Sequence, residues 1–395
     1  MMGKEEMMSS TRGYMSASDI LASTREIVPL LRQLGDQTEA TRRLPSEVVD
    51  ALTKAGVFRL VMPKAWGGPE VDPVTQIQVI ENIALGDASA AWCSMILSGS
   101  GFYASYLEES VAKELFGRLD VRAAGSLKWT GTAEKVAGGY RVTGRWDFGS
   151  GAHHADFMAA GCQVTENGSP VLTAHNMPKI MWVLIPGSEL TIEDTWYTTG
   201  LRGTGSDPYT TKELFVPEER AFNFMECKRS EPLYRYTSLS LYRMVGVQLG
   251  IGRRAIEVVH DLVRAKKVLL TGSSLGDEQW VQMAIAQAEA ILGSAKSYVN
   301  DVVGDLWNTL QAGNMPSLEQ RAKGVLMIAH AADSARRVMD KMCDVAGSSS
   351  IFPSSPLERL RRDLITANTH FLCQQRQYAS IGQALLGVEP AFPYF

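Results

Sequence analysis

The chain has 395 residues, of which 45% are hydrophobic and 21% charged, and 39 Lys and Arg nearly balance 43 Asp and Glu for a formal net charge of −4. This balance, without a basic block, argues against nucleic acid as a partner, and the lack of any run of about 18 apolar residues argues against a membrane span. The five cysteines are scattered and form no Cys-x-x-Cys pair, which favours free thiols in the reducing cytoplasm.

Three patterns follow one another along the chain, and its length favours more than one hydrophobic core. Residues 18–118 carry apolar side chains at helical spacing and predict an N-terminal α-helical domain, in which Asp72-Pro73 is one expected helix start and either Asp87 or Ser89 is another. Residues 119–228 break into short β-branched runs between Gly, Asn and Pro, which predicts a central antiparallel β-barrel or sandwich. Residues 229–395 return to long helical stretches and predict a C-terminal four-helix bundle. Its expected helices are 236–267, 277–311, 318–346 and 357–386.

The most informative segment covers residues 138–151. Gly138-Gly139 is a turn signal, and the residues up to Trp146 alternate in polarity as a half-buried strand does. Phe148 and Ser150 then stand among glycines, with the serine at the tip. Because glycines permit close approach, such a corner can lay backbone amides and one hydroxyl against a flat ligand.

Other segments match one known family in order along the chain. They are residues 63–69, 86–92, 200–207 with 216–217, and the pair Arg362-Asp363. Together with 138–151 they resemble the acyl-CoA dehydrogenase superfamily, and most closely its oxygen-using branch, the flavin-dependent monooxygenases that take reduced flavin from a separate reductase. The resemblance covers nearly the whole chain. It implies an α+β multidomain fold in the order given above, and subunits that assemble into a homotetramer through the last bundle.

A dehydrogenase of this superfamily needs a carboxylate base to remove the α-proton of its thioester substrate. The resemblance places that glutamate eight residues after Asp363, where this chain has Phe371. A minority of members carry it on the first bundle helix, where residues 241–244 contain no carboxylate. A Rossmann Gly-x-Gly-x-x-Gly is also absent, since Gly99-Ser100-Gly101 lies in a helical pattern. Reduced flavin is therefore expected by diffusion from a separate NAD(P)H-flavin reductase.

His370 stands next to the position where the base is missing. By resemblance, a histidine in this helix faces flavin and substrate in the oxygenase members. An imidazole that titrates near neutrality could deprotonate the substrate, or it could donate a hydrogen bond to the departing peroxide oxygen. The alternative is a bundle histidine without a catalytic role. No second histidine occurs near residues 92–106, so Ser126 is a further candidate for handling a proton.

The resemblance also implies which residues contact the flavin. Ser150 is expected near flavin N5, where a hydrogen bond prolongs the life of a C4a-hydroperoxyflavin, and its alternative is an ordinary turn serine. Ser126, Trp129 and Thr130 are expected at the pyrimidine edge of the flavin and at the substrate. Ser126 could equally mark the end of a strand.

Two further pairs complete the expected flavin site of one subunit. Trp146 and Phe148 either border the flavin ring or fill the β-core. Arg202 and Thr204 lie in a glycine-rich turn whose exposed amides and hydroxyls could form a cradle for an anion or for the flavin edge. The alternative is a polar β-turn.

Arg264, Ser348 and Ser349 match regions that, in the family, meet the flavin phosphates of a neighbouring subunit. Arginines on the surface of a helical bundle are otherwise solvated. These three residues are therefore expected cofactor contacts only if subunits pack through the bundle.

The sequence thus predicts the oxygenase component of a two-component flavin-dependent monooxygenase. It would use reduced FAD or FMN (FADH2 or FMNH2) and O2, through a C4a-hydroperoxyflavin, to hydroxylate a small aromatic or heteroaromatic substrate. The alternatives are N- or S-oxygenation on the same fold, an acyl-CoA dehydrogenase-like flavoprotein with an unrecognised base, and a flavin fold retained only for binding. The loop histidines lack metal-ligand spacing, so no metal is predicted.

Overall fold

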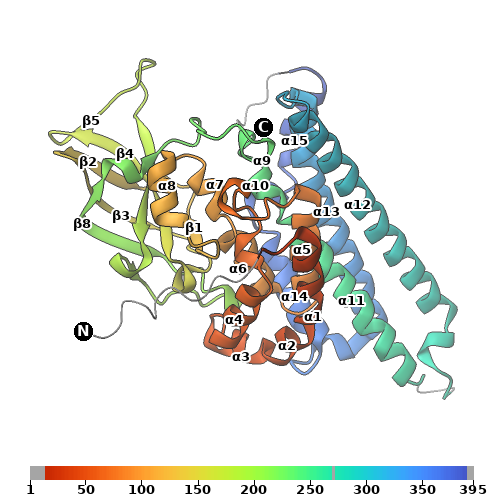
Figure 1. Cartoon of the computed structure of the whole chain (residues 1–395). Coiled ribbons are helices and arrows are strands. Elements are labelled where there is room, and N and C mark those ends of the chain that lie inside the picture. The colour runs from red at the N-terminus through yellow and green to blue at the C-terminus, as the bar shows by residue number, and fades with distance from the viewer. Residues whose placement is uncertain (1–13, 269–271, 389–395) are drawn as a thin grey trace.

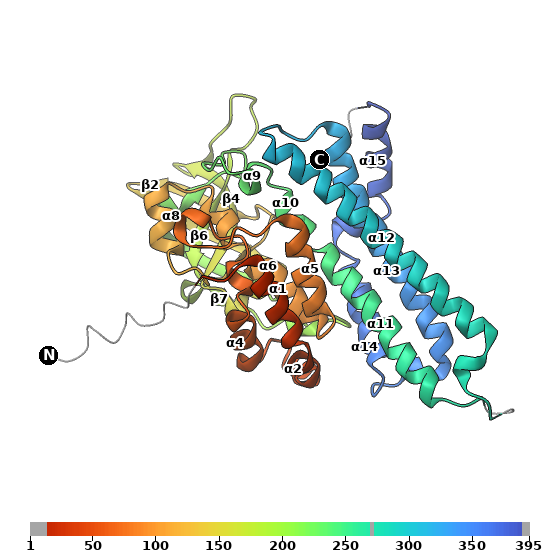
Figure 2. The ribbon, with the colours of Figure 1, turned by 45° about the vertical axis from the view of Figure 1, so that its right-hand side comes forward.

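The computed structural model describes residues 14–268 and 272–388 (Figure 1). Within these residues, helices α1–α8 come first, strands β1–β9 follow, and helices α9–α15 come last, which is the predicted order. Both views place the N-terminal helices between the sheet and the long bundle helices (Figures 1 and 2). The exact domain boundaries remain predictions, and residues 389–395 of the predicted third domain lie outside the described residues.

Side-chain caps begin two of the N-terminal helices at the predicted positions. The Asp72 carboxylate accepts a hydrogen bond from Thr75 N at 3.0 Å, and Pro73 suits the first helical position because no amide partner is needed there. Asp87 caps α6 in the same way, by accepting from Ala90 N at 2.8 Å. The helices of this part are α1 (Ala17–Glu26), α2 (Val28–Gln33), α3 (Gly35–Thr41), α4 (Ser46–Lys54), α5 (Pro73–Ala84), α6 (Ala88–Leu97), α7 (Ser100–Ala104) and α8 (Glu109–Phe116).

The central part is one mixed sheet whose hydrogen-bonded order is β7-β8-β3-β2-β4-β6-β9, with β1 and β5 also paired to β4. The β2–β3 hairpin turns at Gly138, as predicted. The strands are β1 (Ala123–Gly125), β2 (Gly131–Val136), β3 (Gly139–Trp146), β4 (Phe157–Glu166), β5 (Ser169–Pro170), β6 (Ile180–Pro186), β7 (Thr191–Ile192), β8 (Tyr209–Pro217) and β9 (Ala221–Phe222).

The prediction that the sheet is antiparallel throughout is wrong, because β4 pairs in parallel with both β1 and β2. After β3 the chain reverses, passes β2 and re-enters the sheet on the other side of it. Residues 147–156 make this crossing, and they contain Ser150. Strand-length runs report where strands lie but not their direction, so the sequence pattern could not reveal this pairing.

The C-terminal part contains three long helices that run side by side in both views, α11, α12 and α13 (Figures 1 and 2). Its helices are α9 (Pro232–Arg235), α10 (Leu239–Tyr242), α11 (Val245–Ala265), α12 (Gln279–Gln311), α13 (Leu318–Ala346), α14 (Pro356–Ala367) and α15 (Gln377–Leu385). None of the helices in the described part of the chain is both long and apolar enough to cross a bilayer.

The predicted last helix, 357–386, is in fact broken between α14 and α15. Two side-chain amides bind backbone carbonyls at the break: Asn368 Nδ2 donates to Ala332 O on α13 at 3.1 Å, and Gln374 Nε2 donates to Thr369 O at 2.8 Å. No glycine or proline marks this break, so it has none of the ordinary stop signals of a helix. His370 therefore lies on the connection and not in a helix.

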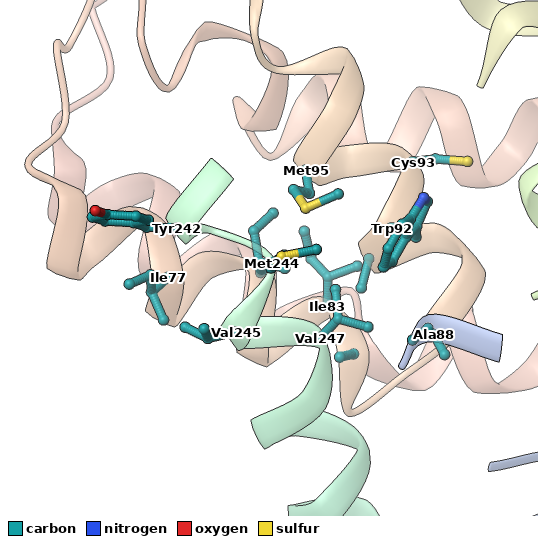
Figure 3. Packing of buried hydrophobic residues seen from close by; sticks show 14 of the residues in the cluster. Ile77, Ile83, Ala88, Trp92, Cys93, Met95, Tyr242, Met244, Val245 and Val247 are labelled. Atoms are coloured by element: carbon teal, nitrogen blue, oxygen red, sulfur yellow. The ribbon is translucent and has the colours of Figure 1, made fainter. Parts of the chain in front are cut away.

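Glycines allow α11 to pack closely against α5. A Cβ at Gly246 would lie 2.5 Å from Ile77 O, and one at Gly250 would lie 2.5 Å from Ala84 Cβ. Figure 3 shows this junction, where Met244, Val245 and Val247 meet side chains of α5 and α6. The contact fixes the bundle against the helix that carries Trp92.

We predict that Gly246→Ala destabilises the fold by about 1–3 kcal/mol, because the new methyl group would meet a backbone oxygen that cannot move without separating α5 from α11. Gly293→Ala on α12 is the matched control, since its Cβ meets nothing within 4 Å. It should stabilise the protein by about 0.5–1 kcal/mol through helix propensity. Urea unfolding of both variants measures the difference, and equal effects would contradict the close packing.

Candidate active site

Ser150 lies within a chain of hydrogen-bonded hydroxyls. Its Oγ is 2.7 Å from Ser206 Oγ, which is itself 2.7 Å from Thr204 Oγ1. Thr204 Oγ1 donates to Leu201 O at 2.7 Å, and a carbonyl can only accept. The direction of the chain is therefore fixed: Ser150 donates to Ser206, and Ser206 donates to Thr204.

Trp92 on α6 completes this chain. Its Nε1 donates a hydrogen bond to Ser150 Oγ at 3.1 Å. The Ser150 hydroxyl therefore accepts one hydrogen bond and donates another. One lone pair of Ser150 Oγ then remains without a donor among the described residues, and an N–H group of a ligand can use it. The sequence did not reveal this role for Trp92, because a tryptophan in an apolar helix is most often a core residue.

His370 also contacts Trp92. The two rings are edge to face with centroids 6.0 Å apart, and Phe371 packs against the imidazole at 4.6 Å. His370 Nδ1 accepts a hydrogen bond from Leu372 N at 3.4 Å. Since Nδ1 accepts, the proton of the neutral ring belongs on Nε2, and no described residue accepts a hydrogen bond from Nε2.

The titration of His370 near neutrality that the sequence suggested is wrong for this structure. Burial lowers the pKa of His370 from 6.5 to about 4, because the charged imidazolium would lose its hydration. The ring is therefore neutral at pH 7. It suits the role of a hydrogen-bond donor through Nε2–H better than that of a base.

Backbone hydrogen bonds fasten the Ser150 corner to the turn at residues 201–207. Gly151 N donates to Thr204 O at 3.0 Å, and Gly149 N donates to Asp207 O at 3.2 Å. Phe148 has a φ of +64°, a left-handed conformation that bulky residues rarely adopt. This conformation leaves the Phe148 ring 58% exposed beside the corner.

Asp363 holds the 201–207 turn from α14. Its Oδ1 accepts from Leu201 N at 2.6 Å, and Leu201 itself is left-handed at φ +49°. Burial, and next the negative charge of Asp87, raise the pKa of Asp363 to about 7. The Arg-Asp motif thus positions the residues that bind Ser150.

Ser126, Trp129 and Thr130 lie on the segment between β1 and β2. Ser126 N donates to Tyr209 Oη at 2.9 Å, and its own Oγ accepts from Lys128 N at 3.2 Å. Trp129 is 53% exposed, and Thr130 Oγ1 donates to Arg145 O at 2.7 Å. Lys128 Nζ lies 5.0 Å above the centre of the Phe148 ring, which places this segment beside the Ser150 corner.

Two of the expected flavin contacts, Trp146 and Thr204, are buried. Trp146 has no exposed surface, stacks on Tyr209 at 5.4 Å and donates to Gly161 O, so the structure places it in the β-core. Thr204 is buried with its hydroxyl committed to the Ser150 chain. The glycine-rich turn therefore packs inward, and its amides are not exposed as the sequence suggested. Arg202 Nε is buried without a hydrogen-bond partner among the described residues.

Arg264 lies near the end of α11, and Ser348 and Ser349 lie in the 3₁₀ turn that follows α13. Both helices end on the side of the bundle that faces away from the sheet (Figures 1 and 2). Arg264 is exposed near the end of α11. Lys266 Nζ donates to Ser349 Oγ at 3.2 Å and to Ala346 O at 3.0 Å, which joins this helix end to the 3₁₀ turn Gly347–Ile351. The structure does not bring them to Ser150 of the same chain.

Comparison with known proteins agrees with this arrangement. Residues 22–126 match the family described as acyl-CoA dehydrogenase, N-terminal domain, and residues 242–375 match acyl-CoA dehydrogenase, C-terminal domain. Indole-3-acetate monooxygenase of Acinetobacter baumannii is 31% identical over 88% of this chain and 89% of its own length. The chain belongs to the acyl-CoA dehydrogenase superfamily.

Two further proteins are similar to this chain over nearly its whole length. The flavin-dependent monooxygenase oxygenase subunit HsaA of Rhodococcus jostii is 28% identical over 92% of this chain and 97% of its own length. The crystal structure of 3-HSA hydroxylase from Rhodococcus sp. RHA1 superimposes with a TM-score of 0.87, at 26% identity, over 95% of this chain and 99% of the other. The family predicted from the sequence, including its flavin-dependent monooxygenase branch, is confirmed.

Neither position at which a dehydrogenase of the superfamily carries its base holds a carboxylate here. Phe371 stands at the first and packs on His370. The second falls in residues 241–244, where Tyr242 is buried in the core and Arg243 brings a cation in place of an acid.

The residues at the Ser150 corner fit the flavin that this branch of the superfamily uses. The free lone pair of Ser150 can accept from an N–H group, and the buried, unpartnered Nε of Arg202 can donate to a flavin oxygen. The exposed rings of Phe148 and Trp129 offer flat apolar surface beside them.

We predict that His370 makes the protein sensitive to mild acid. The unfolded chain takes up the histidine proton near pH 6.5 and the folded chain only near pH 4, so this contribution to stability is present above pH 6.5 and is lost as the pH falls toward 4. At pH 5 the loss amounts to about 1–2 kcal/mol. His370→Gln should therefore lose that much less stability than the parent between pH 7 and pH 5 in urea unfolding. The same change at the exposed His175 is the control and should not alter the difference.

Proposed function

We propose that this chain is the oxygenase component of a two-component flavin-dependent monooxygenase that hydroxylates a small aromatic or heteroaromatic substrate. The observation that carries the proposal is the fixed direction of the Ser150 hydrogen bonds. Ser150 Oγ can accept at the ligand but has no proton left to donate. Reduced flavin carries an N–H at N5 and oxidised flavin does not, so this oxygen favours the reduced form.

The missing base separates this function from a dehydrogenase. Abstraction of an α-proton requires a positioned base, and a neutral His370 with a low pKa is a poor one. When bound, reduced FAD or FMN supplies the electrons that activate O2. The protein's part is then to bind the flavin, to hold a hydrogen bond at N5 and to orient the substrate.

His370 has a defined part in this scheme. Its Nε2–H has no acceptor in the described structure, and its ring packs edge to face on Trp92, which donates to Ser150. It can donate a hydrogen bond to the oxygen atom that departs as the substrate is hydroxylated. A preorganised donor aimed at developing negative charge accelerates such a step without any change of its own charge.

The proposal also covers the supply of reduced flavin and the assembly of the subunits. A separate NAD(P)H-flavin reductase would deliver reduced flavin by diffusion in the cytoplasm, as the phrase oxygenase subunit in the name of HsaA suggests. Arg264, Ser348 and Ser349 would meet the flavin phosphates of a neighbouring subunit in a homotetramer. The exposed apolar side chains of Trp280 and Met283 on α12 support burial of this bundle between subunits.

We predict that Ser150→Ala loses activated oxygen as hydrogen peroxide faster than the parent does. Anaerobic protein with FMNH2 or FADH2 is mixed with oxygenated buffer, and oxygen uptake and peroxide release are followed together. In the parent, peroxide should lag behind oxygen uptake, and loss of one hydrogen bond of about 0.5–1.5 kcal/mol should speed its release about 3- to 10-fold. Ser169→Ala, the same change on the exposed strand β5 at the far end of β4, should behave as the parent. Release without any lag in the parent would contradict the proposed function.

We predict that His370→Ala keeps the parental peroxide lag but forms product about 10²–10³-fold more slowly, the usual cost of losing one preorganised donor. Product is detected by mass spectrometry as a gain of one oxygen across a panel of phenols and indoles. His370→Gln, whose amide can still donate, should lose less. The parental rate should not depend on an ionisation of His370 between pH 6 and 8. A neutral ionisation that disappears in the variant would instead identify His370 as a base.

A further inference from the structure

Leu201 connects the Ser150 hydrogen-bond chain to a buried acid. Its N–H donates to Asp363 Oδ1 at 2.6 Å, and its carbonyl accepts from Thr204 Oγ1 at 2.7 Å and from Trp196 Nε1 at 3.0 Å. The left-handed φ of +49° sets the directions of both groups, and a leucine adopts this conformation only where other contacts hold it. The bond to Asp363 is therefore one of the contacts that keep the Leu201 carbonyl directed at Thr204.

The carboxyl group of Asp363 is buried without a paired cation. Only 5% of its surface is exposed, and none of the described residues forms an ion pair with it. Arg359 and Arg362 lie on the same helix, α14, but they pair with other carboxylates. A buried carboxylate that no cation balances takes up a proton more readily than an exposed one, because burial disfavours its charge.

The principal charges that act on Asp363 come from three elements. Asp87 at the N-cap of α6 and Glu39 on α3 are negative, and Arg359 on α14 is positive. Helices α11 and α13 also pack on α14, and none of their charged groups is among these principal charges. Burial, and next the charge of Asp87, raise the pKa of Asp363 to about 7. The group therefore changes its charge between pH 6 and pH 8.

The direction of the hydroxyl chain decides what Ser150 offers to a ligand. While Leu201 O accepts from Thr204, each hydroxyl donates toward that carbonyl, and Ser150 Oγ presents only a lone pair. Once the carbonyl turns away, Thr204 can donate to Ser206, and Ser206 can donate to Ser150. The oxygen atoms stay in place, since a hydroxyl proton rotates to suit its partners. The proton of Ser150 is then free for the ligand.

We propose that Asp363 is a positioning residue that sets the hydrogen-bond direction at Ser150, and thereby the preference of the site for reduced over oxidised flavin. Charged hydrogen bonds are about twice as strong as neutral ones, so the ionised carboxylate holds the Leu201 amide more firmly than the neutral acid does. Protonation of Asp363 weakens this hold and lets the hydroxyl chain reverse. Reduced flavin donates at N5 and oxidised flavin accepts there, so reversal lowers the preference for the reduced form. The proposal rests on the proposed function, because it concerns the regulation of that same flavin site.

The test measures flavin binding and not turnover. Dissociation constants for oxidised FMN and FAD, and for their reduced forms under anaerobic conditions, are determined by calorimetry at pH 6 and pH 8. Asp363→Asn keeps an oxygen that can accept from Leu201 N but carries no charge, so it represents the neutral acid. At pH 8 the parent should prefer reduced flavin about 3- to 10-fold more than this variant does, the worth of one hydrogen bond. At pH 6 the two proteins should agree. Asp50→Asn, which changes an exposed acid on α4, should behave as the parent at both pH values.

Two further changes separate this role from a general structural one. In the Ser150→Ala background, Asp363→Asn should leave the preference unchanged at both pH values, whereas a structural effect of Asp363 would add to that of Ser150. Thr204→Val breaks the chain between Leu201 and Ser206 while Asp363 stays intact. It should lower the preference for reduced flavin at pH 8 as Asp363→Asn does, and it decides the question if Asp363→Asn does not fold.

An infrared measurement on the flavin-free protein gives an independent readout. Between pH 6 and pH 8 the parent should lose the absorption of one protonated carboxyl group, and Asp363→Asn should lack this change. A parent without that change, or a preference at pH 8 that is equal in parent and variant, would overturn the proposal. So would a pH-dependent difference in preference that persists in Asp363→Asn beyond the ionisation of free flavin. That result would assign the effect to another group, such as His153, whose Nε2 lies 2.8 Å from Asp207 Oδ2. A peroxide lag in the parent would, in those cases, leave the proposed function standing.

Discussion

The site depends on one hydrogen-bond chain with a fixed direction, which begins at the Trp92 indole and ends at Leu201 O. The terminal carbonyl decides the orientation of every hydroxyl between them, because it can only accept. The chain joins three segments that are far apart in the sequence: helix α6, the crossing after β3 and the turn before β8. Ser150 is thereby held with an acceptor, and not a donor, available to a ligand.

The backbone around this hydrogen-bond chain is strained, and further hydrogen bonds hold it in place. Phe148 and Leu201 are both left-handed without being glycine, which costs of order 1–3 kcal/mol each. The amide of Leu201 is held by Asp363, and the corner next to Phe148 is held by the amides of Gly149 and Gly151. Phe148 and Leu201 redirect the backbone toward the site. The packing of α14 on the turn that contains Leu201 therefore stabilises the geometry at Ser150.

Much of this could be inferred from residues in order along the chain. The caps at Asp72 and Asp87, the hairpin at Gly138 and the corner at Ser150 are local signals, and the structure confirms the helix starts and the hairpin. The parallel pairing of β2 with β4 was not predictable, because strand direction is set by the whole crossing and not by any short pattern.

The sequence also could not reveal the roles of residues whose partners lie on other elements of the fold. In the sequence, Trp92 resembled a core tryptophan, but in the structure its indole N–H donates to Ser150. The Arg362-Asp363 pair was only a family motif, but in the structure Asp363 binds the amide of Leu201. The break at Asn368 contains no glycine or proline, and it arises because the asparagine amide binds α13. In each case a polar group finds its partner on another element, and sequence spacing cannot supply that partner.

The buried ionisable groups around the site explain its chemical character. The environment lowers the pKa of His370 and raises that of Asp363, so each moves toward its neutral form at pH 7. Their contributions to stability oppose each other: that of His370 is lost as the pH falls from 6.5 toward 4, whereas that of Asp363 is lost as the pH rises from about 4 toward 7. A site built from neutral donors and acceptors stabilises charge that develops during a reaction without holding charge beforehand.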